Sequence, residues 1–86
     1  MAEYSLSFAR SAGKELDRLD PTVAKRVMSA IEKLTHNPRP SGCVKLQGSQ
    51  NEWRIRIGDW RVVYTVNDTT KIVDIAAVRH RSDVYR

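Results

Sequence analysis

The stretch EWRIRIGDWRVVYTV, residues 52–66, constrains the fold more than any other part of the chain. Two runs rich in β-branched and aromatic residues flank Gly58-Asp59. A two-residue type II′ turn needs a positive φ at its first central position, which suits glycine. The pattern therefore predicts a β-hairpin that turns at Gly58-Asp59. The opposed pairs in this register are Ile57–Trp60, Arg56–Arg61, Ile55–Val62, Arg54–Val63 and Trp53–Tyr64.

Side chains of such a hairpin divide between two faces, because successive residues of a strand point to opposite sides. One face is apolar and is expected to join the core; it consists of Trp53, Ile55, Ile57, Trp60, Val62 and Tyr64. The other face carries Arg54, Arg56, Arg61, Val63 and Thr65.

Arg56 directly opposite Arg61 is the unusual feature of the second face. Two like charges in that position destabilise a hairpin by a few tenths of a kcal/mol up to about 1 kcal/mol. Two interpretations are open here: a solvated polar face, or a site for a polyanion whose charge relieves the repulsion. Arginine suits the second, because its planar guanidinium forks onto phosphate and stays charged.

The first half of the chain predicts a strand and a helical hairpin. Apolar residues alternate with polar ones over residues 2–8, and then recur at helical spacing from Phe8 to Leu19. Asp20-Pro21 begins a second helix, since aspartate is a good N-cap and proline is favoured at the first helical position. The prolines at 38 and 40 end that helix.

The second half predicts strands. Val44–Leu46 is a short candidate strand, the arginine-bearing hairpin follows, and the nearly all-apolar run Ile72–Val78 is expected to be a strand covered on both faces. The order β-α-α-β-β-β-β predicts an α+β fold, in which a twisted and mainly antiparallel sheet packs against an antiparallel helical hairpin. The basic tail, residues 79–86, either frays or docks beside the arginine face.

Size, charge and cysteine content narrow the class of protein. The 86 residues predict one domain spanning residues 1–86, and a net charge of +5 favours nucleic acid or acidic partners. Cys43 is the single cysteine and cannot form an internal disulfide, which fits a reducing cytoplasm. No signal peptide, membrane-spanning run or Cys/His cluster is recognisable, so neither a membrane, a metal nor a cofactor is expected.

Two motifs, VKLQGSQNEWRIRIGDWRVVYTV and VRHRSDVYR, together with the order of elements, resemble the RelE family of the RelE/ParE toxin superfamily. The resemblance covers essentially the whole chain. It implies a RelE-like fold and a ribosome-dependent messenger-RNA endoribonuclease, an mRNA interferase. Such an enzyme acts on mRNA in the A site of the 70S ribosome, driving the 2′-hydroxyl onto the adjacent phosphate. It also implies a cognate antitoxin protein that neutralises the toxin.

The resemblance also implies site residues. Arg54 and Arg56 match basic positions before the hairpin turn, and Arg61 matches an arginine after it. The pentavalent phosphorane carries extra negative charge, which prepositioned guanidinium groups stabilise. The candidate catalytic residues are Arg54, Arg56, Arg61, Arg79, Tyr85 and His80. The candidate RNA-binding residues are Lys45, Arg54, Arg56 and Arg81.

The proton transfers are the point where this sequence departs from the family. The best-known member has lysines at the positions of Arg54 and Arg56. Arginine, with a pKa of about 12.5 or above, is a poor general base. The role then passes to Tyr85, which matches the family's functional tyrosine, or to His80, whose ordinary pKa of about 6.5 is closer to neutral. Tyr85 is the preferred candidate.

Two alternative functions are open on the sequence alone. A ParE-type toxin shares the fold but inhibits DNA gyrase without catalysis, and such proteins generally lack the full set of arginines with a C-terminal tyrosine. A plain RNA-binding module is expected to carry exposed aromatic residues beside its basic ones, whereas the hairpin aromatics fall on the opposite face.

Overall fold

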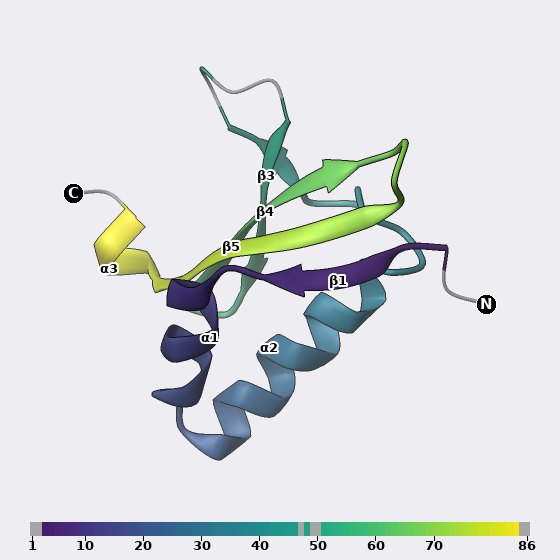
Figure 1. Cartoon of the computed structure of the whole chain (residues 1–86). Helices are drawn as coiled ribbons and strands as arrows, with labels where there is room; N and C mark the ends of the chain where they lie inside the picture. The colour runs from purple at the N-terminus through teal and green to yellow at the C-terminus, as the bar shows by residue number, and fades with distance from the viewer. Residues whose placement is uncertain (1–2, 47, 49–50, 85–86) are drawn as a thin grey trace.

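The computed structural model shows a sheet with two helices packed on one of its faces (Figure 1). The structure describes residues 3–46, 48 and 51–84. The elements in chain order are β1 (Ser5–Phe8), α1 (Arg10–Asp17), α2 (Pro21–Lys33), β2 (Val44–Lys45), β3 (Glu52–Ile57), β4 (Trp60–Asn67), β5 (Ile72–His80) and α3 (Arg81–Val84). The α+β order predicted from the sequence is confirmed, and the short helix α3 is added to it.

The five-stranded sheet has the order β1-β5-β4-β3-β2. β1 runs parallel to β5, whereas every other neighbouring pair is antiparallel. The helical hairpin of α1 and α2 carries the chain from the β1 edge across one face to the β2 edge (Figure 1). The strands β2 to β5 then return one by one, so that β5 ends beside β1, far from it in sequence.

The register predicted for the β3–β4 hairpin is confirmed at every pair. Ile57 lies opposite Trp60, and the pairing continues without interruption to Glu52 opposite Thr65. Gly58 has a φ of 58°, whereas Asp59 is not among the described residues with a positive φ. A positive φ at the first central residue alone is what a type II′ turn requires.

The core lies between the helices and one face of the sheet. The apolar hairpin face belongs to it as predicted: Ile55, Val62 and Tyr64 are buried, and the hairpin's tryptophans pack against them. Val27 and Ile31 of α2 are fully buried against this layer. In the part of the chain that the structure describes, no helix has the length and apolarity needed to cross a membrane.

Two expectations about apolar residues are wrong. Phe8 does not start the stripe of the first helix; it ends β1 and is 39% exposed, because α1 begins only at Arg10. β5 is not covered on both faces, because both long helices lie on the same side of the sheet (Figure 1). Ile72 is 38% exposed, and only Val73, Ile75 and Val78 of this strand are buried.

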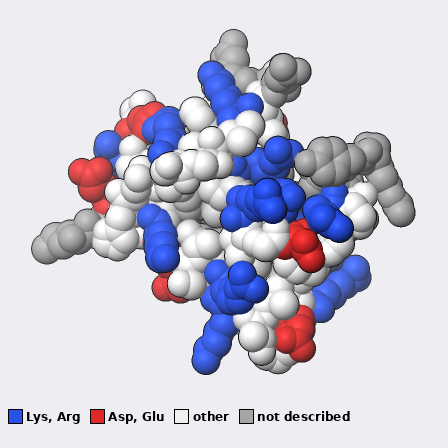
Figure 2. All heavy atoms as spheres, turned by 180° about the vertical axis from the view of Figure 1, so that it is seen from behind, with Lys and Arg blue, Asp and Glu red and all other residues white. Residues whose placement is uncertain are grey.

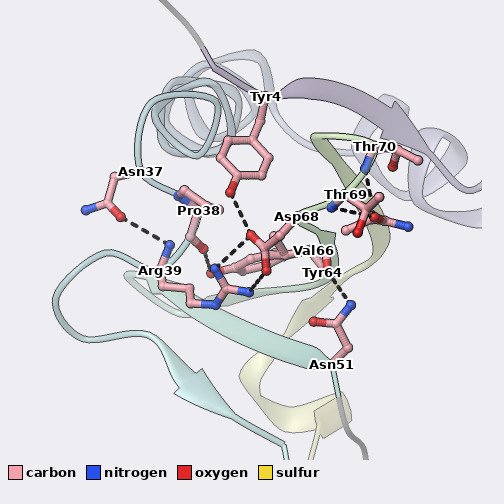
Figure 3. Close-up of polar contacts among 11 residues, drawn as sticks. Tyr4, Asn37, Pro38, Arg39, Asn51, Tyr64, Val66, Asp68, Thr69 and Thr70 are labelled. Atoms are coloured by element: carbon pink, nitrogen blue, oxygen red, sulfur yellow. Dashed lines mark hydrogen bonds and ion pairs between the residues drawn. The ribbon is translucent and has the colours of Figure 1, made fainter.

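A polar cluster ties three connections together (Figure 3). The Tyr4 hydroxyl donates to Asp68 Oδ1 at 2.6 Å, and the Arg39 guanidinium donates to both Asp68 carboxylate oxygens at 3.2 and 2.8 Å. Next to it, the Tyr64 hydroxyl donates to the Pro38 carbonyl at 2.7 Å. These contacts join three connections: the residue before β1 (Tyr4), the segment after α2 (Pro38 and Arg39) and the turn after β4 (Asp68). They lie at the end of the hairpin strands away from Gly58.

Asp68 is expected to make the stability of the protein depend on acid pH. Hydrogen bonds from Arg39 and then Tyr4 lower its pKa from 3.8 to about 2. Because the folded pKa is the lower one, the stabilisation is complete above the unfolded pKa and is lost as the pH falls from about 4 to about 2. Melting temperatures measured across this range should show the advantage of wild type over Asp68→Asn shrinking with acid. Asp17→Asn, on exposed α1, is the control; an advantage that is independent of pH would contradict the prediction.

Candidate active site

β3, β4 and β5 bring three arginines into one row across the open face of the sheet. Arg56 lies opposite Arg61, and Arg61 lies opposite Arg79. Neighbouring strands are about 4.8 Å apart, so the three backbone positions span about 10 Å. Figure 2 shows Lys and Arg side chains near the middle of the face seen from behind and at several places around its margin. Arg56, Arg61 and Arg79 are called the arginine row below.

A β-bulge in β5 is the reason that Arg79 belongs to this row. Tyr64 lies opposite Ile75 but the preceding Val63 lies opposite Ala77, so Ala76 is an extra residue. One extra residue reverses the alternation of side chains along the rest of the strand. Without the bulge, Arg79 would point to the core face together with Ile75.

Arg61 differs from the exposed arginine that the sequence suggested. It lies on the predicted face, away from the apolar core, but the residue is only 7% exposed. Its Nη1 donates to the backbone carbonyls of Gly58 and Trp60, at 3.0 Å each. The turn carbonyls thus fix the guanidinium beside the hairpin turn, and the strand positions on either side of Arg61 are those of Arg56 and Arg79. Within the described residues Arg61 forms no ion pair with a carboxylate.

Arg79 is held by Glu15, a residue that sequence reasoning missed. The Arg79 Nε donates to Glu15 Oε2 at 2.8 Å, and Glu15 Oε1 accepts the backbone N–H of Val78 at 2.9 Å. β1 stops at Phe8, opposite Ile75, so the edge of β5 beyond that point is covered by α1. Nothing in the sequence distinguishes Glu15 from the other acidic residues of a surface helix.

Arg54 and Arg81 lie next to the row. Arg54 is opposite Val63 on the same face and is half-buried. Arg81 begins α3; its backbone N–H donates to the Asp59 carbonyl at 2.7 Å, and its Nε lies 3.8 Å from Asp59 Oδ1. From the sequence, the tail is expected either to fray or to dock beside the arginine face. The structure favours docking, because the start of α3 contacts the hairpin turn.

Two predicted site residues lie on the face of the sheet opposite the arginine row. Lys45 is opposite Trp53, and its Nζ lies 5.9 Å from the centroid of that ring. His80 is opposite Trp60, with the two rings edge to face at 5.3 Å. Both follow from strand alternation, because each shares the face of its tryptophan and not that of the arginines. Tyr85 lies outside the described residues.

The arginine row is suited to binding a phosphate. Glu15 neutralises one of its three cations, and the repulsion among them is relieved by an anion. Arg61 is desolvated and fixed by backbone carbonyls, so its charge acts in a less polarisable surrounding than water. The fold and this site define a small, basic α+β protein whose open sheet face presents a row of three arginines.

Comparison with known proteins gives the family. The sequence family described as "ParE toxin of type II toxin-antitoxin system, parDE" matches residues 6–85. A putative RelE-like toxin protein from Escherichia coli is 34% identical, over 95% of this chain and 90% of its own length. Putative toxin RelE1 from Methanocaldococcus jannaschii is 30% identical, over 98% of this chain and 97% of its own.

Solved structures agree with this assignment. A chain of the archaeal RelE–RelB complex from Pyrococcus horikoshii is similar with a TM-score of 0.82 and 27% identity, covering 92% of this chain and 96% of that one. The isolated E. coli RelE toxin is similar with a TM-score of 0.81 and 30% identity, covering 95% and 90%. The chain belongs to the ParE toxin family of type II toxin–antitoxin systems, and it is a RelE-like member of it.

Proposed function

We propose that this toxin is a ribosome-dependent endoribonuclease that cuts messenger RNA in the A site of the 70S ribosome. The observation that carries the proposal is the arginine row, with the desolvated Arg61 at its centre. In the reaction the 2′-oxygen forms a bond to the neighbouring phosphorus and the bond to the 5′-oxygen breaks. The products are a 2′,3′-cyclic phosphate and a 5′-hydroxyl.

The charge of the transition state explains why such a row serves this chemistry. The five-coordinate phosphorus carries more negative charge than the phosphodiester, and groups prepositioned around it stabilise that charge without reorganising. Arg61 would contact the non-bridging oxygens, Arg56 and Arg79 would flank them, and Arg54 would hold the adjoining strand. The proton of the 2′-hydroxyl must go to a base and a proton must reach the leaving 5′-oxygen; Tyr85 is the candidate for this work.

We further infer that the chain has a cognate antitoxin in the cytoplasm, where ribosomes are. The P. horikoshii RelE and the E. coli RelE were each solved as complexes with their RelB partners. The basic charge of this chain, +5, favours an acidic segment in the partner. Binding of the antitoxin is expected to block cleavage.

Inhibition of DNA gyrase is the second candidate, because the matching family is described by its ParE member. Inhibition of gyrase without catalysis would not require a row of arginines centred on the buried Arg61. A plain RNA-binding module is less well supported, because the hairpin tryptophans pack against the core, on the face of the sheet opposite the arginine row.

The proposed activity is tested by incubating the purified protein with 70S ribosomes programmed with a defined message. Cleavage ends are mapped by primer extension, and the 3′ ends are tested for cyclic phosphate. We expect cuts within the A-site codon that need the ribosome and that stop when the co-expressed antitoxin is added. Intact message together with inhibited supercoiling by DNA gyrase would establish the second candidate instead.

Glu15→Gln is expected to slow single-turnover cleavage by about 10-fold to 100-fold, because Arg79 loses its charged anchor and its fixed position. The ribosome concentration that gives half the maximal rate should not rise, since removing a carboxylate does not weaken attraction to RNA. Glu32→Gln, an exposed acid of α2 without an ion pair among the described residues, is the matched control. A wild-type rate for Glu15→Gln would show that the anchor is dispensable.

A further inference from the structure

A second cationic feature lies between α2 and the hairpin. A groove of about 690 Å³ is lined there by Lys25, Arg26 and Lys33 of α2 and by Arg56 of β3, and the rest of its lining is small or apolar. None of the described residues that line it is acidic. This groove is called the α2 groove below.

The groove exists because β3 becomes an edge strand near the turn. β2 pairs with Trp53 and Arg54, and among the described residues no strand pairs with β3 on that side from Ile55 to Ile57. In a two-residue hairpin the closing pair, here Ile57 with Trp60, is hydrogen-bonded, and hydrogen-bonded and non-bonded pairs then alternate. The backbone N–H of Arg56 therefore points away from β4, toward the open edge.

The positive charge of the groove is not neutralised. Across residues 3–46, 48 and 51–84, none of the four lining cations takes part in an ion pair, whereas Arg39, Arg79 and Arg81 each do. Arg26 reaches across to the hairpin turn: a Cβ atom built on Gly58 would lie 3.6 Å from its Nη2. Cations gathered in this way repel one another unless an anion lies between them.

Arg56 connects the groove to the arginine row. It lines the groove and also lies opposite Arg61 in the row, so positive charge continues around the edge of β3. We propose that the α2 groove binds the phosphate backbone of the same RNA strand whose cleaved phosphate the arginine row holds. The proposal rests on the proposed function. An acidic protein segment has similar charge, but the continuity through Arg56 favours the strand that is already bound at the row.

The test compares two triple variants that lose equal charge. Lys25→Gln/Arg26→Gln/Lys33→Gln changes the groove and leaves the arginine row intact. Arg10→Gln/Lys14→Gln/Arg18→Gln removes the same charge from exposed positions on α1 and at its C-cap. The probe is a short fluorescent oligouridine, titrated by anisotropy at several KCl concentrations, with melting curves to confirm folding.

The groove variant is expected to bind the oligouridine about 10-fold more weakly. Its plot of log K against log salt should become shallower, by about 0.7 in slope for each phosphate that the protein no longer neutralises. The α1 variant should change affinity by less than about 3-fold, because screening weakens charges that do not touch the strand.

Other outcomes overturn the proposal. Equal losses in the two variants would mean that only net charge matters. If the groove variant binds oligouridine normally but binds 70S ribosomes more weakly, the groove is assigned to ribosomal RNA. If it binds both normally but no longer binds the antitoxin, the groove is assigned to a protein partner. By contrast, if the two variants differ as expected but the wild-type protein does not cut ribosome-bound message, the proposed cleavage is refuted and the groove is still supported as an RNA site.

Discussion

Arg61→Lys is expected to lower single-turnover cleavage of ribosome-bound message by about 100-fold to 1,000-fold, the usual cost of removing one prearranged donor to a transition state. The arginine uses Nη1 to bind the carbonyls of Gly58 and Trp60. Its remaining N–H groups are then fixed in direction. A lysine ammonium keeps the charge but has no planar fork, so it cannot hold the turn and present a second edge to phosphate at once.

The matched control is Arg18→Lys, the same change on the exposed end of α1. Arg61→Ala should lose cleavage to at least the same degree. It should also lose about 1–3 kcal/mol of unfolding free energy, because partly buried carbonyls lose their donor. Rates are measured beside thermal melting. If Arg61→Lys cuts at the wild-type rate, or if it melts as much earlier as Arg61→Ala while losing little activity, Arg61 has a structural role alone.

Tyr85→Phe is expected to lose about 100-fold to 10,000-fold in the single-turnover rate, the range for removal of a general acid or base. His80→Gln should lose little. His80 packs edge to face on Trp60, on the face of the sheet opposite the arginine row, and its Nδ1 lies 3.0 Å from Ser82 Oγ. The measurement is the cleavage rate on programmed ribosomes as a function of pH, for wild type and both variants.

His36→Gln, an exposed histidine after α2, is the control for this pair. Loss of cleavage in His80→Gln alone, together with loss of a titration near neutral pH, would reverse the assignment and make the histidine the base. If both variants cut like wild type, neither carries the proton. Catalysis would then rest on the arginines and on the ribosome's positioning of the RNA.

Several features of the fold followed from local chemistry, which is why the sequence predicted them. Gly58 supplies the one positive φ that the turn needs, and strict alternation on both sides leaves only one register that buries the apolar face. Asp20 accepts the Thr22 backbone N–H at 3.1 Å and Pro21 begins α2, as the Asp-Pro pair indicated. The resemblance to RelE toxins, drawn from two motifs, is confirmed by the relatives and by the solved structures.

The sequence by itself determined that Arg56 would face Arg61, because a two-residue turn leaves no freedom in how its strands pair. Only the tertiary structure decided that Arg79 joins them, because an extra residue at Ala76 changes which way the end of β5 faces. A run of apolar residues gives no sign of such a bulge. The burial of Arg61 and its position between two cations likewise depend on strands and carbonyls brought together in space. So does the contact with Glu15, which lies 64 residues before Arg79 and meets it only because β1 ends early and α1 covers the exposed edge of β5.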